Sequence, residues 1–139
     1  MSETLNPYLT FNGKAAEAMK FYQSVLGGDL NMQTFAEAKM AKMESENNRI
    51  VHARLNTGPI TLMASDSMIE RPAQIGQNVS LSLMGSDTAR LTEIFKRLSE
   101  GGQIEMPLAK QFWGDTYGMC TDRFGIHWMV NISSTQSRQ

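Results

Sequence analysis

The sequence lacks several features that mark broad protein classes. No apolar run approaches the roughly 18 residues that a membrane-spanning helix requires. The N-terminal stretch MSETLNPYL has neither the basic nor the apolar region of a secretory signal peptide. The single cysteine, Cys120, has no partner for an intrachain disulfide, which fits a reducing compartment. We therefore expect a cytoplasmic protein without a membrane segment.

An excess of one charge is also absent. The chain carries 13 Lys and Arg and 14 Asp and Glu, and its formal net charge is −1. Because these residues are scattered, the sequence has no basic stripe of the kind that binds nucleic acid and no acidic tail. Nucleic acid is therefore not an expected partner.

The motifs of several catalytic centres are missing as well. GxSxG, CxxC and HExxH do not occur. No glycine-rich strand-to-helix loop for a nucleotide cofactor is present, because Gly27-Gly28 and Gly101-Gly102 both end predicted helices. We predict no cofactor, with a divalent metal as the alternative that the only two histidines, His52 and His127, leave open.

The 139 residues suffice for one domain, and 41% of them are hydrophobic, which is enough for a core. The eleven methionines suit either an adaptable core or an adaptable apolar pocket. Of these two interpretations we expect the core.

A first half of the chain follows the order strand, helix, and three strands. The helix is predicted over Lys14 to Leu26, where apolar residues recur at helical spacing before Gly27-Gly28. The strands are predicted at Leu5–Phe11, Asp29–Phe35, Arg49–Asn56 and Ile60–Ala64. The charged stretch from Ala36 to Ser45 is expected to form a short exposed helix or a mobile flap.

The same order recurs about seventy residues later, which indicates an internal duplication. The second helix is predicted over Ser86 to Ser99, before Gly101-Gly102. The strands are predicted at Asn78–Met84, Gln103–Met106, Asp115–Thr121 and Ile126–Ile132. We expect a single domain, 1–139, in which module one spans about 1–66, a linker 67–76, and module two about 77–135.

Each module has one helix, which covers one face of its sheet. The other face is polar in three strands by period-two alternation: His52, Arg54 and Asn56; Asn78, Ser80 and Ser82; His127, Met129 and Asn131. These faces either lie in bulk water, as is common for antiparallel sheets, or curl together into a cup. The duplication favours the cup.

Four stretches of the chain resemble the vicinal oxygen chelate superfamily, which includes glyoxalase I, extradiol dioxygenases and bleomycin-resistance proteins, and within it the PhnB-like branch. They are PYLTFNGKAAEAMKFYQSVLGG (Pro7 to Gly28), His52-Ala53, ITLMASD (Ile60 to Asp66) and FWGDTYGMCTDRFGIHWMVN (Phe112 to Asn131). The resemblance implies an α+β fold: two βαβββ modules forming a curved, eight-stranded cleft or half-barrel with the helices outside. It also implies a homodimer.

The resemblance further implies four cleft-facing metal ligands in the enzymes of this superfamily. Their positions correspond here to Pro7, His52, Asn78 and Met129. Proline has no ligating side chain, methionine is a poor ligand for hard metals, and asparagine alone is weak, so this metal site is expected to be dismantled. His52 and His127 are weak candidates for a relocated metal, with Cys120 or a water completing the site.

The candidate ligand-binding residues lie on the predicted polar faces or near the mouth of the cleft: His52, Arg54, Asn78, Ser80, Trp113, Tyr117, His127 and Met129. Several have ordinary structural alternatives. His52 is either a hydrogen-bonded strand residue or a ligand contact. Arg54 either clamps an anion or pairs with a glutamate, and Trp113 either stacks on a ligand or seals one end of the sheet.

We predict a protein that binds a small, partly polar molecule without the usual metal. The alternative is a divalent-metal-dependent lyase, isomerase or dioxygenase that uses His52 with non-standard partners. A third hypothesis is a scaffold whose own side chains fill the cleft.

Overall fold

The computed structural model describes residues 2–134, which divide into two compact units between Gln74 and Ile75. The outer bounds expected for the modules, residues 1 and 135, lie outside the described residues. Module one contains β1 (Tyr8–Phe11), α1 (Ala15–Leu26), β2 (Asp29–Thr34), the 3-10 turn η1 (Glu44–Glu46), β3 (Ile50–Asn56) and β4 (Thr61–Asp66). Module two contains β5 (Leu81–Gly85), α2 (Thr88–Ser99), β6 (Gln103–Lys110), β7 (Thr116–Thr121) and β8 (His127–Ile132).

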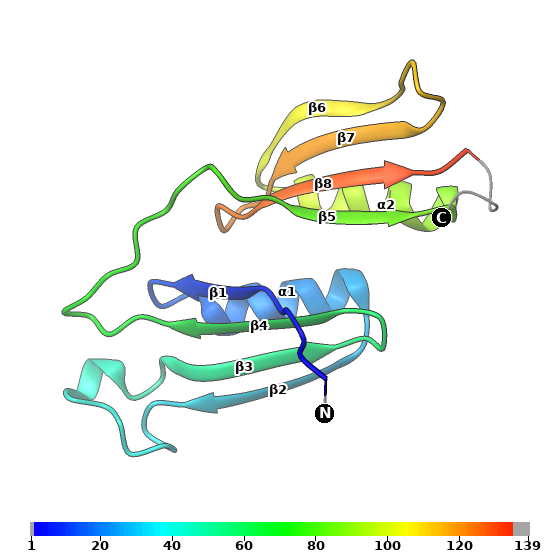
Figure 1. The fold of residues 1–139 in the computed structure, drawn as a ribbon. Coiled ribbons are helices and arrows are strands. Elements are labelled where there is room, and N and C mark those ends of the chain that lie inside the picture. The colour runs from blue at the N-terminus through cyan, green and yellow to red at the C-terminus, as the bar shows by residue number, and fades with distance from the viewer. Residues whose placement is uncertain (1, 135–139) are drawn as a thin grey trace. The chain divides into compact units, whose positions relative to one another are not determined.

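Each module has one four-stranded mixed sheet. The strand orders are β1-β4-β3-β2 and β5-β8-β7-β6, and the first pair in each is parallel while the others are antiparallel. Figure 1 shows α1 lying along the first sheet and α2 along the second. The predicted α+β fold of two βαβββ modules is confirmed.

The two helices form where apolar residues recur every three or four positions. Each has 12 residues, and within residues 2–134 no helix is long and apolar enough to cross a membrane. The side of α1 that faces its sheet is buried through Ala15, Ala18, Met19, Tyr22, Val25 and Leu26. The corresponding side of α2 is buried through Leu91, Ile94, Phe95 and Leu98. Burying these side chains against a sheet is the main stabilising contribution of each helix.

The Gly-Gly pairs end both helices, as predicted, and their second glycines have a further role. Gly28 lies so close to the backbone of Asn56 that an added Cβ would clash with its carbonyl oxygen. Gly102 has the same relationship with the carbonyl oxygen of Thr121. In both modules the chain leaving the helix therefore passes against the end of the third strand of that module, where only glycine fits.

One face of each sheet carries no helix, and cross-strand pairing shows which residues share it. On the first sheet, Tyr8 pairs with Met63, which pairs with Arg54. On the second sheet, Ser82 pairs with Met129, Met129 with Met119, and Met119 with Met106. Paired residues point to the same side, and we call these two sides the helix-free faces.

The prediction for Ala36 to Ser45 is wrong in its helical alternative. This stretch forms turns and leads into η1, and no α-helix lies between β2 and β3. Phe35 before it and Glu46 after it are buried. The Glu46 carboxylate accepts hydrogen bonds from the backbone N–H groups of Lys42 and Ile69, and these contacts hold the loop in a non-helical path.

Several predicted strand bounds are also wrong: β1 begins at Tyr8 and not at Leu5, and β4 spans Thr61–Asp66 and not Ile60–Ala64. β5 begins at Leu81, so Asn78 and Ser80 precede the strand, and the side chain of Val79 is 70% exposed instead of packed on α2. β6 extends past Met106 to Lys110 and contains Pro107. It tolerates this proline because β6 is an edge strand whose pairing with β7 is irregular between Met106 and Ala109.

The expectation that the methionines fill the core is wrong for most of them. Among residues 2–134, Met19 is the only methionine that is buried. The others are half-buried or exposed, and Met63, Met84, Met106, Met119 and Met129 belong to helix-free faces. The methionines therefore form surface rather than interior.

Candidate functional site

The helix-free face of module one brings His52 next to Tyr8. The Tyr8 hydroxyl lies 3.3 Å from His52 Nδ1, and the two ring centroids are 5.9 Å apart. Both side chains are exposed. This arrangement fits a polar surface that contacts a ligand through a phenol and an imidazole, because both groups donate and accept hydrogen bonds.

Arg54 follows His52 on the same face and is exposed. It pairs across the sheet with Met63 on one side and Asn31 on the other. Within residues 2–134, Arg54 makes no ion pair with a carboxylate. The alternative in which Arg54 pairs with a glutamate is therefore wrong for this part of the chain, and its guanidinium is available for an anionic group.

The helix-free face of module two is crossed by a row of thioethers, the methionine row, formed by Met106, Met119 and Met129. These residues are cross-strand partners on β6, β7 and β8. Met84 on β5 belongs to the same face, because it pairs with Asn131, two residues beyond Met129 on β8. Methionine side chains are flexible and polarisable, so the row offers a surface that adapts to apolar or aromatic groups.

Aromatic rings lie at one end of this face. The Trp113 ring centroid is 6.0 Å from that of Tyr117, in an edge-to-face arrangement. Phe112 packs edge-on against Trp113 at 4.9 Å but is itself almost fully exposed. Tyr117 faces the same side as Met119, two residues along β7. These rings extend the methionine row with groups that can stack on a planar ligand.

A polar network lies at the other end of the face, around His127. His127 Nδ1 is 2.8 Å from Thr121 Oγ1, and His127 Nε2 is 3.2 Å from the carbonyl oxygen of Gly76. Thr121 Oγ1 in turn donates to Glu105 Oε2 over 2.6 Å. Both ring nitrogens of His127 are thus engaged within module two.

The hydrogen bonds of this network limit which further groups His127 can bind. A carbonyl oxygen only accepts, so Nε2 carries a proton toward Gly76. The Thr121 hydroxyl has a single proton, which it donates to Glu105. Contacts within the protein thus occupy both ring nitrogens of His127, so a metal would have to displace one of them.

A concavity of about 260 Å³ lies beside this network. Its lining residues are Gln77, Ser80, Glu105, Met119, Cys120, His127 and Trp128. It combines an acid, a histidine, a hydroxyl and a thioether within one module. Predicted site residues Ser80 and His127 therefore share one pocket, whereas Asn78 is not part of its lining.

Two buried residues of the pocket lining, Trp128 and Cys120, have structural roles. The Trp128 indole N–H donates to Asp122 Oδ2 over 2.9 Å, and Asp122 Oδ1 accepts from the backbone N–H groups of Phe124 and Ile126. Burial raises the pKa of the Cys120 thiol, so this group stays neutral and unreactive near neutral pH.

The residues present do not fit a catalytic divalent metal. Among residues 2–134, no three His, Cys, Asp or Glu side chains are grouped so as to hold a metal ion. Of the four inherited positions, Pro7 precedes β1 and Asn78 precedes β5. His52 lies beside Tyr8, and Met129 belongs to the methionine row. The four inherited positions therefore offer only one imidazole and one thioether as metal donors.

Comparison with known proteins assigns the family. The family model of the Glyoxalase/Bleomycin resistance protein/Dioxygenase superfamily matches residues 4–130. The chain belongs to this superfamily. The family predicted from its sequence stretches is therefore confirmed.

Proteins similar to this chain come from several bacteria. Protein YjdN of Escherichia coli is 30% identical over 97% of this chain and 99% of its own length. The crystal structure of protein PA1353 from Pseudomonas aeruginosa is 39% identical, covers 95% of this chain and 98% of that one, and has a TM-score of 0.84. A Bacillus cereus PhnB protein, described as a putative 3-demethylubiquinone-9 3-methyltransferase, has a TM-score of 0.78 at 22% identity and covers 94% and 100% of the two chains. At that identity the PhnB protein shows a shared fold.

Some residues of these faces were not found by sequence reasoning. Tyr8 contacts His52, Thr121 contacts His127, and Glu105 contacts Thr121. All three belong to strands whose neighbours the sequence does not specify. Met84, Met106 and Met119 were not singled out as site residues, although Met84 and Met119 alternate with apolar or small residues. Period-two alternation can place a methionine on one side of its own strand, but it does not say which residues lie beside it on the neighbouring strands.

Proposed function

We propose that the protein binds a small, partly polar organic molecule on its helix-free faces and that module two supplies much of the contact. The observation that carries this proposal is the pocket beside His127, with the methionine row next to it. A face that sets an adaptable apolar row between aromatic rings and a polar network suits a molecule with one apolar part and one hydrogen-bonding end.

The polar contacts in this proposal come from two groups of residues. Ser80, Glu105 and His127 line the pocket and would orient the hydrogen-bonding end of the ligand. His52, with Tyr8 beside it, and Arg54 present a second polar group on module one. Such binding requires shape, stacking and hydrogen bonds and no chemical step, so sequestration is the function that these residues support best.

The alternative proposal is a divalent-metal-dependent lyase, isomerase or dioxygenase that uses His52. Superfamily membership supports it, whereas the donor set at the inherited positions does not. The two proposals differ in metal content: stoichiometric Ni, Zn, Mn or Fe in protein purified without chelator, lost in His52→Ala, would favour the enzyme. A scaffold with a self-filled cleft would show no stabilisation by any small molecule.

A thermal-shift screen of small aromatic and heteroaromatic compounds with polar substituents tests the binding proposal. A ligand at about 100 times its Kd stabilises the folded state by about 2.7 kcal/mol, which is several degrees in Tm for a chain of this size. For each hit, the variant Met106→Glu places a charge in the methionine row and is expected to abolish the shift.

The matched control is Met43→Glu, because Met43 and Met106 are 37% and 40% exposed and Met43 lies in the loop before η1. Met43→Glu is expected to keep the ligand-induced shift. If both variants retain it, the methionine row is not the contact surface. If no compound stabilises the wild-type protein, the scaffold hypothesis replaces ours.

A homodimer in the cytoplasm remains our expectation for the assembled protein. Superfamily membership supports the dimer, and the lone cysteine fits a reducing compartment. Light scattering at several protein concentrations measures the oligomeric state, and a mass of one chain at all of them would contradict it.

A further inference from the structure

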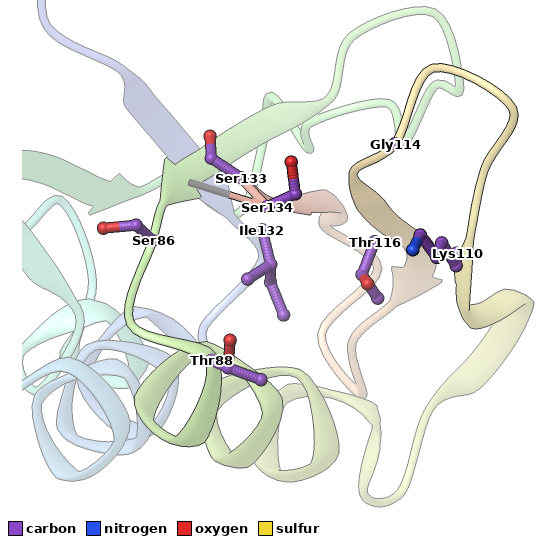
Figure 2. Close-up of a pocket in the computed structure, with 8 residues that line it drawn as sticks. All are labelled: Ser86, Thr88, Lys110, Gly114, Thr116, Ile132, Ser133 and Ser134. Atoms are coloured by element: carbon purple, nitrogen blue, oxygen red, sulfur yellow. The ribbon is translucent and has the colours of Figure 1, made fainter. Parts of the chain in front are cut away.

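A second cavity lies at the far end of module two, where β8 ends and α2 begins. Its volume is about 220 Å³. The lining residues are Ser86, Thr88, Lys110, Gly114, Thr116, Ile132, Ser133 and Ser134. Figure 2 shows Thr88 at the start of α2, Lys110 and Thr116 from the facing strands, and Ile132 between them. This cavity shares no lining residue with the pocket beside His127.

The lining is rich in hydrogen-bond donors. Five of its eight residues carry a hydroxyl group, and Lys110 adds an ammonium group, whose nitrogen points toward Thr116 in Figure 2. Within residues 2–134 these hydroxyls have no hydrogen-bond partner, and Lys110 has no carboxylate partner. No acidic side chain lines the cavity. The lining is therefore suited to a ligand that accepts hydrogen bonds and carries negative charge.

The duplication allows the same place to be examined in module one. The Ser67 N–H donates to the Phe11 carbonyl over 2.8 Å, and the Ser133 N–H donates to the Gly85 carbonyl over 2.7 Å. Each bond follows directly after the last residue pair of the parallel strands in its module. That last pair is Phe11–Asp66 in module one and Gly85–Ile132 in module two. Asp66 and Ile132 therefore occupy corresponding positions.

In module one a carboxylate occupies this position. Asp66 Oδ1 accepts from the N–H groups of Gly13 and Ala15 over 2.8 and 3.0 Å, and Asp66 Oδ2 accepts from the Ile50 N–H over 2.9 Å. The carboxylate thus joins the start of α1 to the start of β3. In module two the corresponding side chain is the apolar Ile132, and a polar cavity lies beside it between the starts of α2 and β7.

Two acidic residues near the cavity, Asp87 and Asp115, already accept hydrogen bonds from protein groups, and one of these groups belongs to the lining residue Ser134. Asp87 Oδ1 caps α2 by accepting from the Arg90 N–H over 3.1 Å. Asp115 Oδ2 accepts from Asn131 Nδ2 over 3.0 Å, and Asp115 Oδ1 accepts from the Ser134 N–H over 3.2 Å. Their charges lower the affinity for an anion by Coulomb repulsion, and Lys110 is the lining residue that opposes them.

We propose that this cavity binds a compact oxyanion, a carboxylate or phosphate group, at the place where module one holds the carboxylate of Asp66. Lys110 supplies the charge, and the hydroxyls of Thr88 and Thr116 supply neutral hydrogen bonds. The site is independent of the ligand proposed for the helix-free faces, since the two share no residue. It gives module two an anion-dependent contact between helix and sheet.

The test is a chemical-shift titration of the isotope-labelled full chain with sodium acetate and, separately, with inorganic phosphate, at constant ionic strength maintained with sodium chloride. Saturable shifts are expected at the backbone N–H groups of Thr88, Ala89 and Thr116. Lys110→Met is expected to weaken binding about tenfold through loss of a charge-assisted hydrogen bond. Lys96→Met, which removes an exposed lysine from the last turn of α2, is the matched control.

A second variant, Ile132→Asp, copies the Asp66 arrangement into module two and is expected to abolish the titration by filling the site with a tethered carboxylate. Ile132 is buried, so Thr88→Val provides a test that leaves the core intact. Saturation by acetate alone or by phosphate alone identifies the class of oxyanion. Shifts that rise linearly with anion concentration, or that are equal in Lys110→Met and the wild type, overturn the proposal.

Discussion

The Tyr8 hydroxyl lies 3.3 Å from His52 Nδ1 on the helix-free face of module one, and the two residues come from strands that are not neighbours in the sheet. β4 lies between β1 and β3 in the sheet, so the side chains of Tyr8 and His52 approach each other across β4. The histidine that looks isolated in the sequence is thus one half of a polar pair. This contact is the basis for the effects that we expect of His52→Ala on metal content and stability.

We expect His52→Ala to leave the metal content of the protein unchanged. His52 is exposed and, with Tyr8, lacks the further His, Cys, Asp or Glu that a catalytic metal requires in residues 2–134. The free energy of unfolding is expected to change by no more than about 0.5 kcal/mol, as for other surface positions. Elemental analysis of chelator-free preparations and urea unfolding measure both quantities. A stoichiometric metal present only in the wild type would refute this expectation.

Asp66→Ala is expected to destabilise the protein by about 3 kcal/mol, because three backbone N–H groups lose a charged acceptor at once. Asp66 is 5% exposed, so water cannot replace the carboxylate fully. The control is Asp29→Ala at the exposed start of β2. Urea unfolding of the two variants gives the difference. Equal losses would mean that Asp66 does not join α1 to β3 energetically.

The stability of the loop before β3 is expected to depend on pH through Glu46. Hydrogen bonds from the backbone N–H groups of Lys42 and Ile69 lower the pKa of the Glu46 carboxyl below its ordinary value of 4.5. The stabilising contribution is therefore complete above pH 4.5 and is lost as the pH falls through the lowered pKa. Glu46→Gln is expected to be less stable at neutral pH and to lose less stability on acidification.

The control for Glu46→Gln is Glu44→Gln, because Glu44 belongs to the same turn and is exposed. Denaturant unfolding between pH 7 and pH 3 provides the measurement. If the two variants show the same slope of stability against pH, Glu46 is not the group responsible.

The Cys120 thiol is expected to react with a thiol reagent only when module two opens. It is buried, and burial raises its pKa above the ordinary 9.0, so the folded state disfavours the reactive thiolate. For the same reason the contribution of Cys120 to stability decreases as the pH rises above 9.0. Labelling rates with and without sub-denaturing urea are the measurement, and a rate typical of free thiols in native buffer would contradict the expectation.

The matched control for this labelling is the double variant Cys120→Ser with Val79→Cys. Val79 is 70% exposed, so its replacement should react at the rate of an accessible thiol without urea. A slow reaction of this variant would mean that the region before β5 is protected in solution.

The features that the sequence predicted well are local ones. The spacing of Leu91, Ile94, Phe95 and Leu98 specifies a helix with one buried side, and all four are buried in α2. Alternation along Ile126 to Ile132 placed Trp128 and Val130 in the core and His127 and Met129 on the other side. These predictions succeeded because the period of a strand or helix is a property of neighbours in the chain.

The features that the sequence did not predict depend on lateral register. The methionine row exists only because β6, β7 and β8 align Met106, Met119 and Met129, and no local pattern states that alignment. The loop after Phe35 has helix-forming composition, yet the buried carboxylate of Glu46 binds two backbone N–H groups in a different path. Tertiary hydrogen bonds there outweigh a helix propensity of a few tenths of a kcal/mol per residue.

Among residues 2–134, every strand pairs only with strands on its own side of the peptide bond between Gln74 and Ile75. A polypeptide cut at that bond would keep both strands of every pair in the same fragment. Each fragment can accordingly be synthesised by itself and its circular dichroism compared with that of the intact chain. Such an experiment would measure how much of the cooperativity of folding belongs to a single ancestral repeat and how much arose when the repeat was copied.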